Sequence, residues 1–97
     1  MITQKEIIDV LKKFKNQNSE DLGIVNIGLF GSFARNENTA NSDIDILYEL
    51  DEITWNKICK VEESLSKLFT VNTDVVCKHK ALRPFFLKRI EQEIIYV

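Results

Sequence analysis

The alternation of side chains over residues 43–50, Asp-Ile-Asp-Ile-Leu-Tyr-Glu-Leu, constrains the fold of this chain more than any other feature. Successive side chains of an extended strand point to opposite faces, so a strand that is buried on one face alternates in this way. One face is apolar and consists of Ile44, Ile46, Tyr48 and Leu50. The other face consists of Asp43, Asp45, Leu47 and Glu49. The run predicts a strand that buries its apolar face and presents two carboxylates on the other.

Asp43 and Asp45 are the first candidate site residues. Two residues of strand rise roughly 6.6 Å, so both carboxylates lie on one face and are able to converge on one cation or to bridge two. Two unit charges about 4 Å apart repel by roughly 4 kcal/mol at an effective dielectric constant of about 20, and a divalent cation removes that penalty. Mg²⁺ favours a few carboxylate oxygens together with waters and phosphates. The alternative is that Asp43 ends the polar loop 36–42 and Asp45 is a solvated residue of an edge strand.

A second strand-like run, residues 24–30, ends at Gly31-Ser32, and ten residues separate this pair from Asp43. The run is apolar apart from two residues, which indicates a buried strand entering a tight turn, and we expect residues 33–35 to open a short helix. Gly31 would let a phosphate approach the backbone, the helix N-terminus and the Ser32 hydroxyl would donate to it, and Arg35 would add positive charge. The alternatives are that Ser32 is a simple helix N-cap and that Arg35 is a surface residue.

Residues 31–35, Gly-Ser-Phe-Ala-Arg, followed by residues 42–47, Ser-Asp-Ile-Asp-Ile-Leu, resemble the signature of the minimal nucleotidyltransferases. These are the smallest members of the DNA polymerase beta-like nucleotidyltransferase superfamily, and the resemblance extends over nearly the whole chain, including residues 93–96. Family members often carry Gly after the Arg, where this chain has Asn36, a residue type that tolerates left-handed backbone conformations. The family also uses a third carboxylate on a later strand, which Asp74 within residues 71–76 would supply. Taken alone, Asp74 would equally be a cap or a solvated residue.

The resemblance implies a metal-dependent transfer of a nucleoside monophosphate. Asp43, Asp45 and Asp74 would be the catalytic residues and would hold two Mg²⁺ ions. The donor, expected to be ATP, would be bound through Gly31, Ser32, Arg35 and Ser42. If the three strands are neighbours, Asp74 should lie on the same sheet face as Asp43 and Asp45.

The same resemblance implies a protein partner. Minimal nucleotidyltransferases are typically paired with a small helical HEPN protein in toxin–antitoxin systems, so we expect a hetero-oligomer in which this chain is an antitoxin that adenylylates a partner tyrosine. A non-catalytic antitoxin or binding module that occludes its partner is the second hypothesis. A free-standing enzyme acting on a small molecule or RNA is the third.

Composition sets outer limits. With 97 residues, 44% of them hydrophobic, the chain is expected to form one nucleotidyltransferase domain over 1–97. A formal net charge of −2 argues against a broad basic surface that grips nucleic acid. Residues 78–89 contain several cations and no acid, a pattern more typical of a solvated helix face than of a phosphate site. No signal peptide or membrane span is recognisable, so we expect no membrane association and a cytoplasmic location.

The remaining periodicities predict an α/β (α+β) fold. Thr3 and Glu6 predict a capping box that opens a helix ending near residue 15, followed by a polar loop at 16–21. A second helix over 54–69 should bury Ile58, Val61, Leu65 and Leu68, with Trp55 near its start also in the core. A strand at 71–76 and a last helix from Pro84, with Leu87, Ile90 and Ile94 facing inward, complete the chain, with a short strand at 94–97 as the alternative for its end. This order is typical of a small mixed sheet with helices mainly on one face, the polymerase beta-like arrangement.

Overall fold

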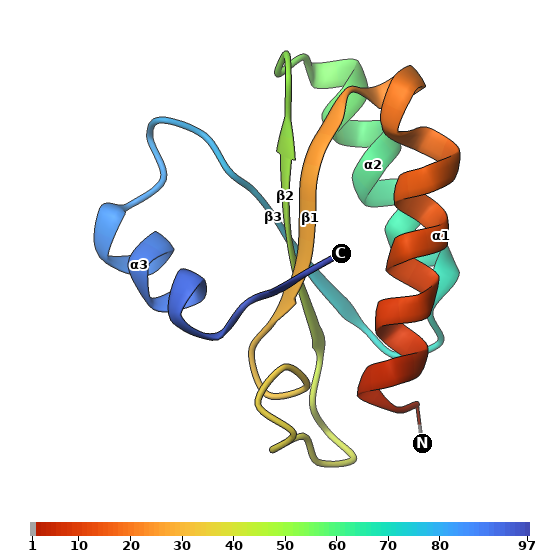
Figure 1. Cartoon of the computed structure of the whole chain (residues 1–97), viewed down its shortest axis with the longest axis vertical. Coiled ribbons are helices and arrows are strands. Elements are labelled where there is room, and N and C mark those ends of the chain that lie inside the picture. Colours follow the sequence, from red (N-terminus) through yellow and green to blue (C-terminus); the bar gives the residue numbers. More distant parts are fainter. Residues whose placement is uncertain (1) are drawn as a thin grey trace.

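The computed structural model describes residues 2–97, which form three helices and a four-stranded mixed sheet (Figure 1). The elements follow the order α1 (Gln4–Leu22), β1 (Ile24–Phe30), β2 (Ile44–Leu50), α2 (Trp55–Leu68), β3 (Thr73–Cys77), α3 (Pro84–Glu93) and β4 (Ile95–Tyr96). The strand order is β3-β2-β1-β4, with β2 and β3 parallel and the other pairs antiparallel. No helix among these residues is long and apolar enough to cross a membrane.

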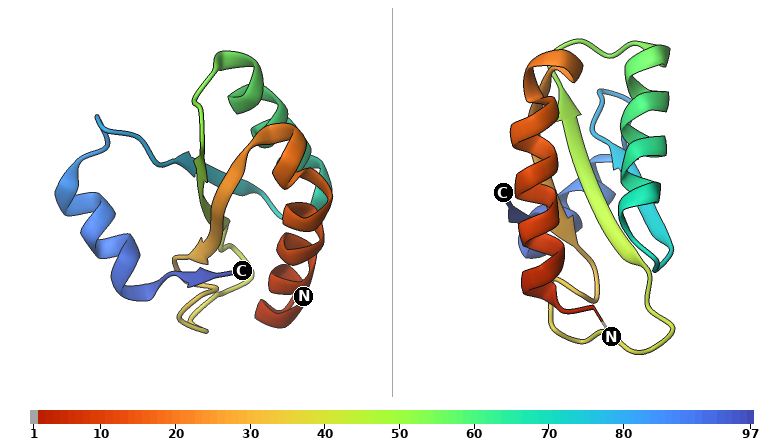
Figure 2. Two further views of the ribbon diagram at one scale, coloured as in Figure 1. Left: turned by 45° about the horizontal axis from the view of Figure 1, so that its top comes forward. Right: turned by 90° about the vertical axis from the view of Figure 1, so that its right-hand side faces the viewer.

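Helices cover both faces of the sheet unequally. The helices α1 and α2 lie side by side on one face, and α3 lies on the other (Figures 1 and 2). The main core lies between the helix pair and the sheet and includes the predicted apolar face of β2, namely Ile44, Ile46, Tyr48 and Leu50. A smaller cluster of Phe30, Leu47 and Ile90 fixes α3 to the opposite face. The apolar face of β2 is therefore buried against α1 and α2. On its other face, which carries the carboxylates, Leu47 packs under α3.

The first helix is longer than predicted. Its capping box is present, because the Thr3 hydroxyl accepts from the Glu6 amide while the Glu6 carboxylate accepts from Thr3. The helix then continues through the segment 16–21, which was wrongly predicted as a loop. Burial of Leu22 holds the last turn on the core, and Gly23, in the left-handed conformation at φ 65°, ends the helix. Polar residues in this stretch mark a solvated helix face.

The second helix buries fewer residues than predicted. Val61 and Leu65 are fully buried and Ile58 packs against the core, as expected. Leu68 is 45% exposed and Trp55 is 77% exposed, so their assignment to the core was wrong. Both lie at the ends of α2, and Phe69, the next residue after Leu68, is buried instead.

Candidate active site

Strand pairing brings the predicted carboxylates together. In the antiparallel pair β1–β2, Phe30 lies opposite Asp45, so the end of β1 meets the start of β2. In the parallel pair β2–β3, Asp45 lies opposite Asp74. Residues directly opposite one another on neighbouring strands share a face. Asp74 is therefore on the same face as Asp45, as expected for neighbouring strands, and Asp43 precedes Asp45 at the strand entrance.

Gly31 lets the Asp45 carboxylate pack against the turn that follows β1. Gly31 has a φ of 78°, a conformation that side chains disfavour. A Cβ atom at this position would lie 2.0 Å from Oδ2 of Asp45. Glycine is thus required at this position for two reasons, namely the backbone conformation and the close approach of the carboxylate.

Residues 31–36 form a turn and not the short helix that was predicted. The Arg35 amide donates to the Gly31 carbonyl and the Glu37 amide donates to the Ser32 carbonyl, which closes the turn. Asn36 adopts the left-handed conformation expected of it, at φ 58°, and this stops helical winding. The side chain of Gln4 in α1 donates to the carbonyls of residues 33 and 34, at 3.1 and 3.0 Å, so these acceptors are satisfied without a helix.

Glu93 at the end of α3 occupies the donors that were predicted to bind phosphate. Its Oε2 atom accepts from the Gly31 amide at 2.9 Å and from Nη1 of Arg35. Arg35 also donates from Nε to Glu37 at 3.1 Å, and these two carboxylates, Glu37 first, raise the pKa of the guanidinium. The turn thus already holds a carboxylate in the position of an anionic ligand. Sequence reasoning did not identify Glu93 as a site residue, because Glu93 and Gly31 are 62 positions apart and no local motif connects them.

The surroundings of Asp45 favour its protonated form. Burial, followed by the charges of Asp74, Asp43 and Glu93, raises the pKa of Asp45 from 3.8 to about 6, against a smaller opposing effect of Arg35. Within residues 2–97, no three Asp, Glu, His or Cys side chains converge closely enough to form a complete metal site. Mg²⁺ characteristically retains waters and substrate phosphates and takes only part of its ligands from the protein. The hard oxygen donors and their uncompensated negative charge therefore fit Mg²⁺.

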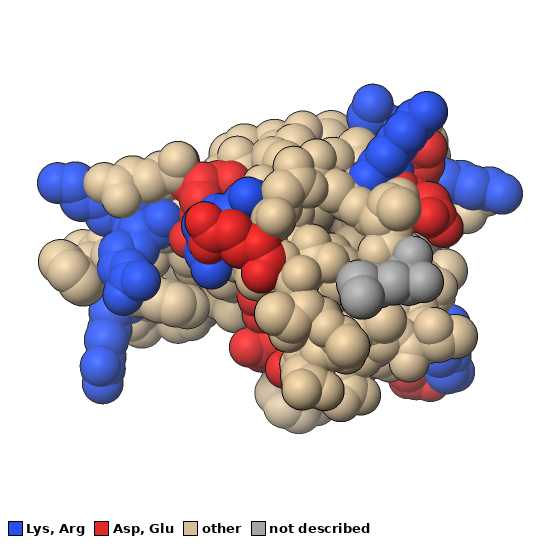
Figure 3. Space-filling model, turned by 90° about the horizontal axis from the view of Figure 1, so that it is seen from below, with Lys and Arg blue, Asp and Glu red and all other residues tan. Residues whose placement is uncertain are grey.

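A cleft of about 350 Å³ lies between the Gly31 turn and α3. It is lined by Phe30, Gly31, Ser32, Arg35, Asp45, Phe86, Arg89, Ile90 and Glu93. Seen from this end of the molecule, Lys and Arg side chains on the left lie beside a group of acidic side chains, and further Lys and Arg side chains lie on the right (Figure 3). Sequence reasoning did not assign Phe86 to the site and placed Arg89 only among the cations of a solvated helix face.

Ser42 and Asp43 lie outside this cleft. They line a neighbouring hollow of about 400 Å³ together with residues 40–41 and 70–72. The Ser42 hydroxyl accepts from the Thr39 amide at 2.8 Å, a contact within the loop before β2. The structure therefore groups Ser42 with the loop and not with Gly31, Ser32 and Arg35.

A larger cleft, of about 440 Å³, lies elsewhere. It is found near the far end of β2, where Glu49 and Leu50 meet Lys78, Leu82 and Leu87. It includes neither the Gly31 turn nor any of the three aspartates. Chemistry, and not size, therefore identifies the smaller cleft as the candidate active site.

Comparison with known proteins matches this chain to a family and to individual relatives. A family model described as nucleotidyltransferase domain matches residues 11–97. A candidate protein adenylyltransferase of Methanocaldococcus jannaschii is 39% identical over 98 residues, covering all of both chains. Protein adenylyltransferase MntA of Thermococcus cleftensis is 36% identical over 98 residues, covering all of this chain and 98% of that protein. This chain therefore belongs to the nucleotidyltransferase family.

Solved structures agree on the fold. A candidate minimal nucleotidyltransferase matches with a TM-score of 0.76 and 25% identity, over 97% of this chain and 95% of that one. The complex of a tri-AMPylated Shewanella oneidensis HEPN toxin with an MNT antitoxin matches with a TM-score of 0.68 and 16% identity, over 97% of this chain and 71% of that one. The fold is thus the α+β fold of the minimal nucleotidyltransferases, as the resemblance implied.

Proposed function

We propose that this chain is a Mg²⁺-dependent adenylyltransferase that transfers AMP from ATP to a hydroxyl of a partner protein. The observation that carries the proposal is the placement of Asp74 opposite Asp45, on the same sheet face and beside the Gly31 turn. In this proposal the three carboxylates and the Gly31 turn act together at one end of the sheet. The relatives named as protein adenylyltransferases support AMP transfer to a protein.

Each side chain would have a defined part in the reaction. Asp43, Asp45 and Asp74 would hold Mg²⁺, which when bound neutralises the triphosphate and aligns it. Ser32 and Arg35 would contact the phosphates, and the ATP would compete with Glu93 for the Gly31 amide and Arg35. Asp74 would accept the proton of the acceptor hydroxyl while the oxygen of that hydroxyl forms a bond to the α-phosphorus. The bond from the α-phosphorus to the bridging oxygen breaks, and pyrophosphate leaves.

The partner that we propose is a HEPN-family toxin, neutralised by adenylylation of a tyrosine within a hetero-oligomer. The support is a structural neighbour described as a tri-AMPylated HEPN toxin in complex with its MNT antitoxin, and another described as a toxin–antitoxin with AMP-PNP. In this proposal residues 1–97 act as one nucleotidyltransferase domain in the cytoplasm.

A second candidate function is neutralisation by occlusion, without catalysis. The exposed apolar side chains favour it, since Trp55 and Phe85 are 77% and 75% exposed and offer contact area to a partner. In that case the nucleotide site would be dispensable for neutralisation.

The double substitution Asp43→Asn and Asp45→Asn separates the two functions. Wild-type protein incubated with the partner, ATP and Mg²⁺ should add one or more AMP masses to the partner, as measured by intact mass spectrometry. The double variant should form the complex on gel filtration yet add no AMP and fail to neutralise the toxin. Full neutralisation by the double variant would support occlusion, and an unchanged partner mass with wild-type protein would refute AMP transfer.

A further inference from the structure

One face of α3 forms the wall of the candidate cleft opposite the Gly31 turn. The four residues that line the cleft from this helix are Phe86, Arg89, Ile90 and Glu93. Their spacing of three and four positions places them in one row along the helix surface. Only Ile90 is buried, in the small core cluster with Phe30 and Leu47. Phe86 and Arg89 are exposed and therefore accessible to whatever enters the cleft, whereas Glu93 is bound to the Gly31 turn.

Phe86 presents an aromatic ring without a place in the core. It is 41% exposed, and it belongs to neither of the two hydrophobic clusters, although its neighbour Leu87 packs against the smaller one. An exposed aromatic ring at the edge of a nucleotide site is suited to stacking on a base, because every nucleobase offers a π face.

Arg89 is a cation without an ionic partner. Within residues 2–97, its guanidinium makes no hydrogen bond or ion pair, although Asp45 and Glu93 line the same cleft. By contrast, Arg35 on the other wall is bound by two carboxylates. Arg89 is thus a cation of the cleft that is available to an incoming anion.

We infer that α3 supplies the donor-nucleotide wall, in which Phe86 stacks on the base and Arg89 binds a phosphate. Glu93 marks the anion position at the Gly31 turn. At a rise of about 1.5 Å per residue, Phe86 lies roughly 10 Å further along the helix, with Arg89 between them. A nucleotide whose phosphates replace Glu93 at the turn would run along this row towards Phe86. The inference rests on the proposed function and assigns the residues that recognise its donor.

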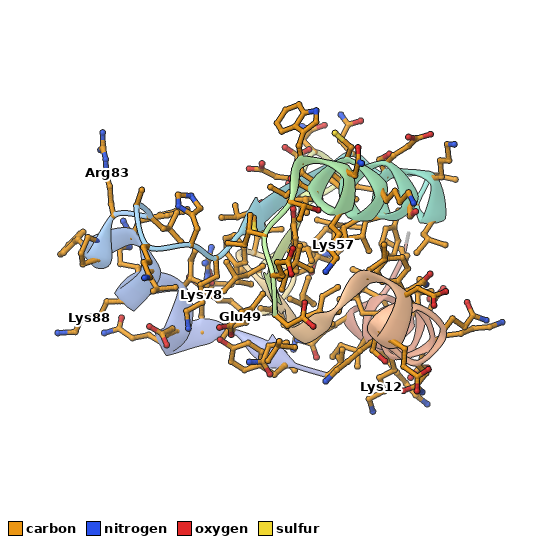
Figure 4. All side chains as sticks on the ribbon, turned by 90° about the horizontal axis from the view of Figure 1, so that it is seen from above. Lys12, Glu49, Lys57, Lys78, Arg83 and Lys88 are labelled. Atoms are coloured by element: carbon orange, nitrogen blue, oxygen red, sulfur yellow. The ribbon has the colours of Figure 1, made fainter. Side chains whose placement is uncertain are left out.

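The helix offers a matched control for each residue. Phe85 is 75% exposed and does not line the cleft, so it controls for loss of an exposed ring beside Phe86. Lys88 adjoins Arg89, does not line the cleft and points outward from α3, as Arg83 does (Figure 4). It controls for loss of one positive charge from the same helix.

The test is a calorimetric titration with two probes, ATP and inorganic tripolyphosphate, each in the presence of Mg²⁺. The proteins are wild type, Phe86→Ala, Phe85→Ala, Arg89→Ala and Lys88→Ala. Phe86→Ala should weaken ATP binding about tenfold and leave tripolyphosphate binding unchanged, because only ATP carries a base. Arg89→Ala should weaken binding of both probes about tenfold, because both carry phosphates. A further variant, Phe86→Trp, should retain ATP binding, and thermal melts should show that all variants are folded.

The outcomes separate this inference from the proposed function. If wild type binds ATP and transfers AMP but Phe86→Ala behaves like Phe85→Ala, base stacking on α3 is refuted. If Arg89→Ala behaves like Lys88→Ala, the phosphate role of Arg89 is refuted. If wild type neither binds ATP nor transfers AMP, the proposed function itself has failed.

Discussion

Replacing Asp45 by Asn should stabilise the ligand-free protein above neutral pH even though it removes a predicted catalytic carboxylate. The pKa of Asp45 is raised from 3.8 to about 6 by burial and by the neighbouring charges of Asp74, Asp43 and Glu93. The folded state therefore holds the proton more tightly than the unfolded state does. This contribution to stability is fully present below about pH 4 and is lost as the pH rises through about 6.

The size of the effect follows from the pKa. At about 1.36 kcal/mol per pKa unit, the change corresponds to about 3 kcal/mol. Because Asp45 is only half-buried and water screens its charge, we halve this to about 1.5 kcal/mol at pH 8. For a chain of this size, the Asn variant should then melt roughly 5–10 °C higher than wild type at pH 8. Near pH 4 the difference should shrink to roughly a few tenths of a kcal/mol.

The assay is urea unfolding of both proteins between pH 4 and pH 8, without metal. Asp9→Asn, at an exposed position of α1, is the control and should change the free energy of unfolding by less than about 0.5 kcal/mol. Mg²⁺ with ATP should stabilise wild type more than the Asp45→Asn variant, because the substitution removes a carboxylate that would bind the ion. An Asp45→Asn variant that is no more stable than wild type at pH 8, or a gain that persists at pH 4, would refute the electrostatic reasoning.

Two further substitutions test the turn. Gly31→Ala should cost at least about 2 kcal/mol of stability and abolish AMP transfer, because alanine would combine a positive φ with a Cβ 2.0 Å from Asp45. Chemical unfolding would measure the loss of stability, and intact mass spectrometry would measure the loss of transfer. Gly23→Ala is the control, because Gly23 has a similar φ and an added Cβ would clash there too, but outside the site. This variant should lose stability but keep its activity when folded. An equal loss of activity in the Gly31 and Gly23 variants would contradict a specific role of Gly31. Glu93→Gln should tighten tripolyphosphate binding severalfold, because it removes the negative charge that competes for the Gly31 amide, whereas exposed Glu91→Gln should not. Weaker binding by Glu93→Gln would mean that Glu93 holds the turn in its binding shape.

Several features of the fold followed from short-range patterns. The capping box at Thr3, the strand at Ile24–Phe30 and the helix that begins at Pro84 are all where their local signals predicted them. The alternation of β2 correctly divided its buried face from its carboxylate face. These predictions succeeded because capping, proline geometry and strand periodicity depend on neighbouring residues.

The errors arose where burial by distant residues decides the outcome. Polar composition suggested that α1 ends early, yet the burial of Leu22 on the core carries the helix on. Helical spacing placed Trp55 and Leu68 in the core, but spacing alone does not reveal which residues at the ends of a helix reach the core. The short helix predicted after Gly31 does not form, because Asn36 is left-handed and the Gln4 side chain of α1 donates to the carbonyls of residues 33 and 34.

The candidate site divides in the same way. The Gly31 turn and the Asp43–Asp45 pair were predicted as candidate site residues from short segments, because their motifs depend on neighbouring residues. The position of Asp74 opposite Asp45 and the bond from Glu93 to a turn 62 residues away depended on strand register and on the docking of α3. The same docking turned Phe86 and Arg89 from exposed helix residues into a wall of the cleft. Such juxtapositions come from packing between segments remote in the chain, and no local propensity encodes them.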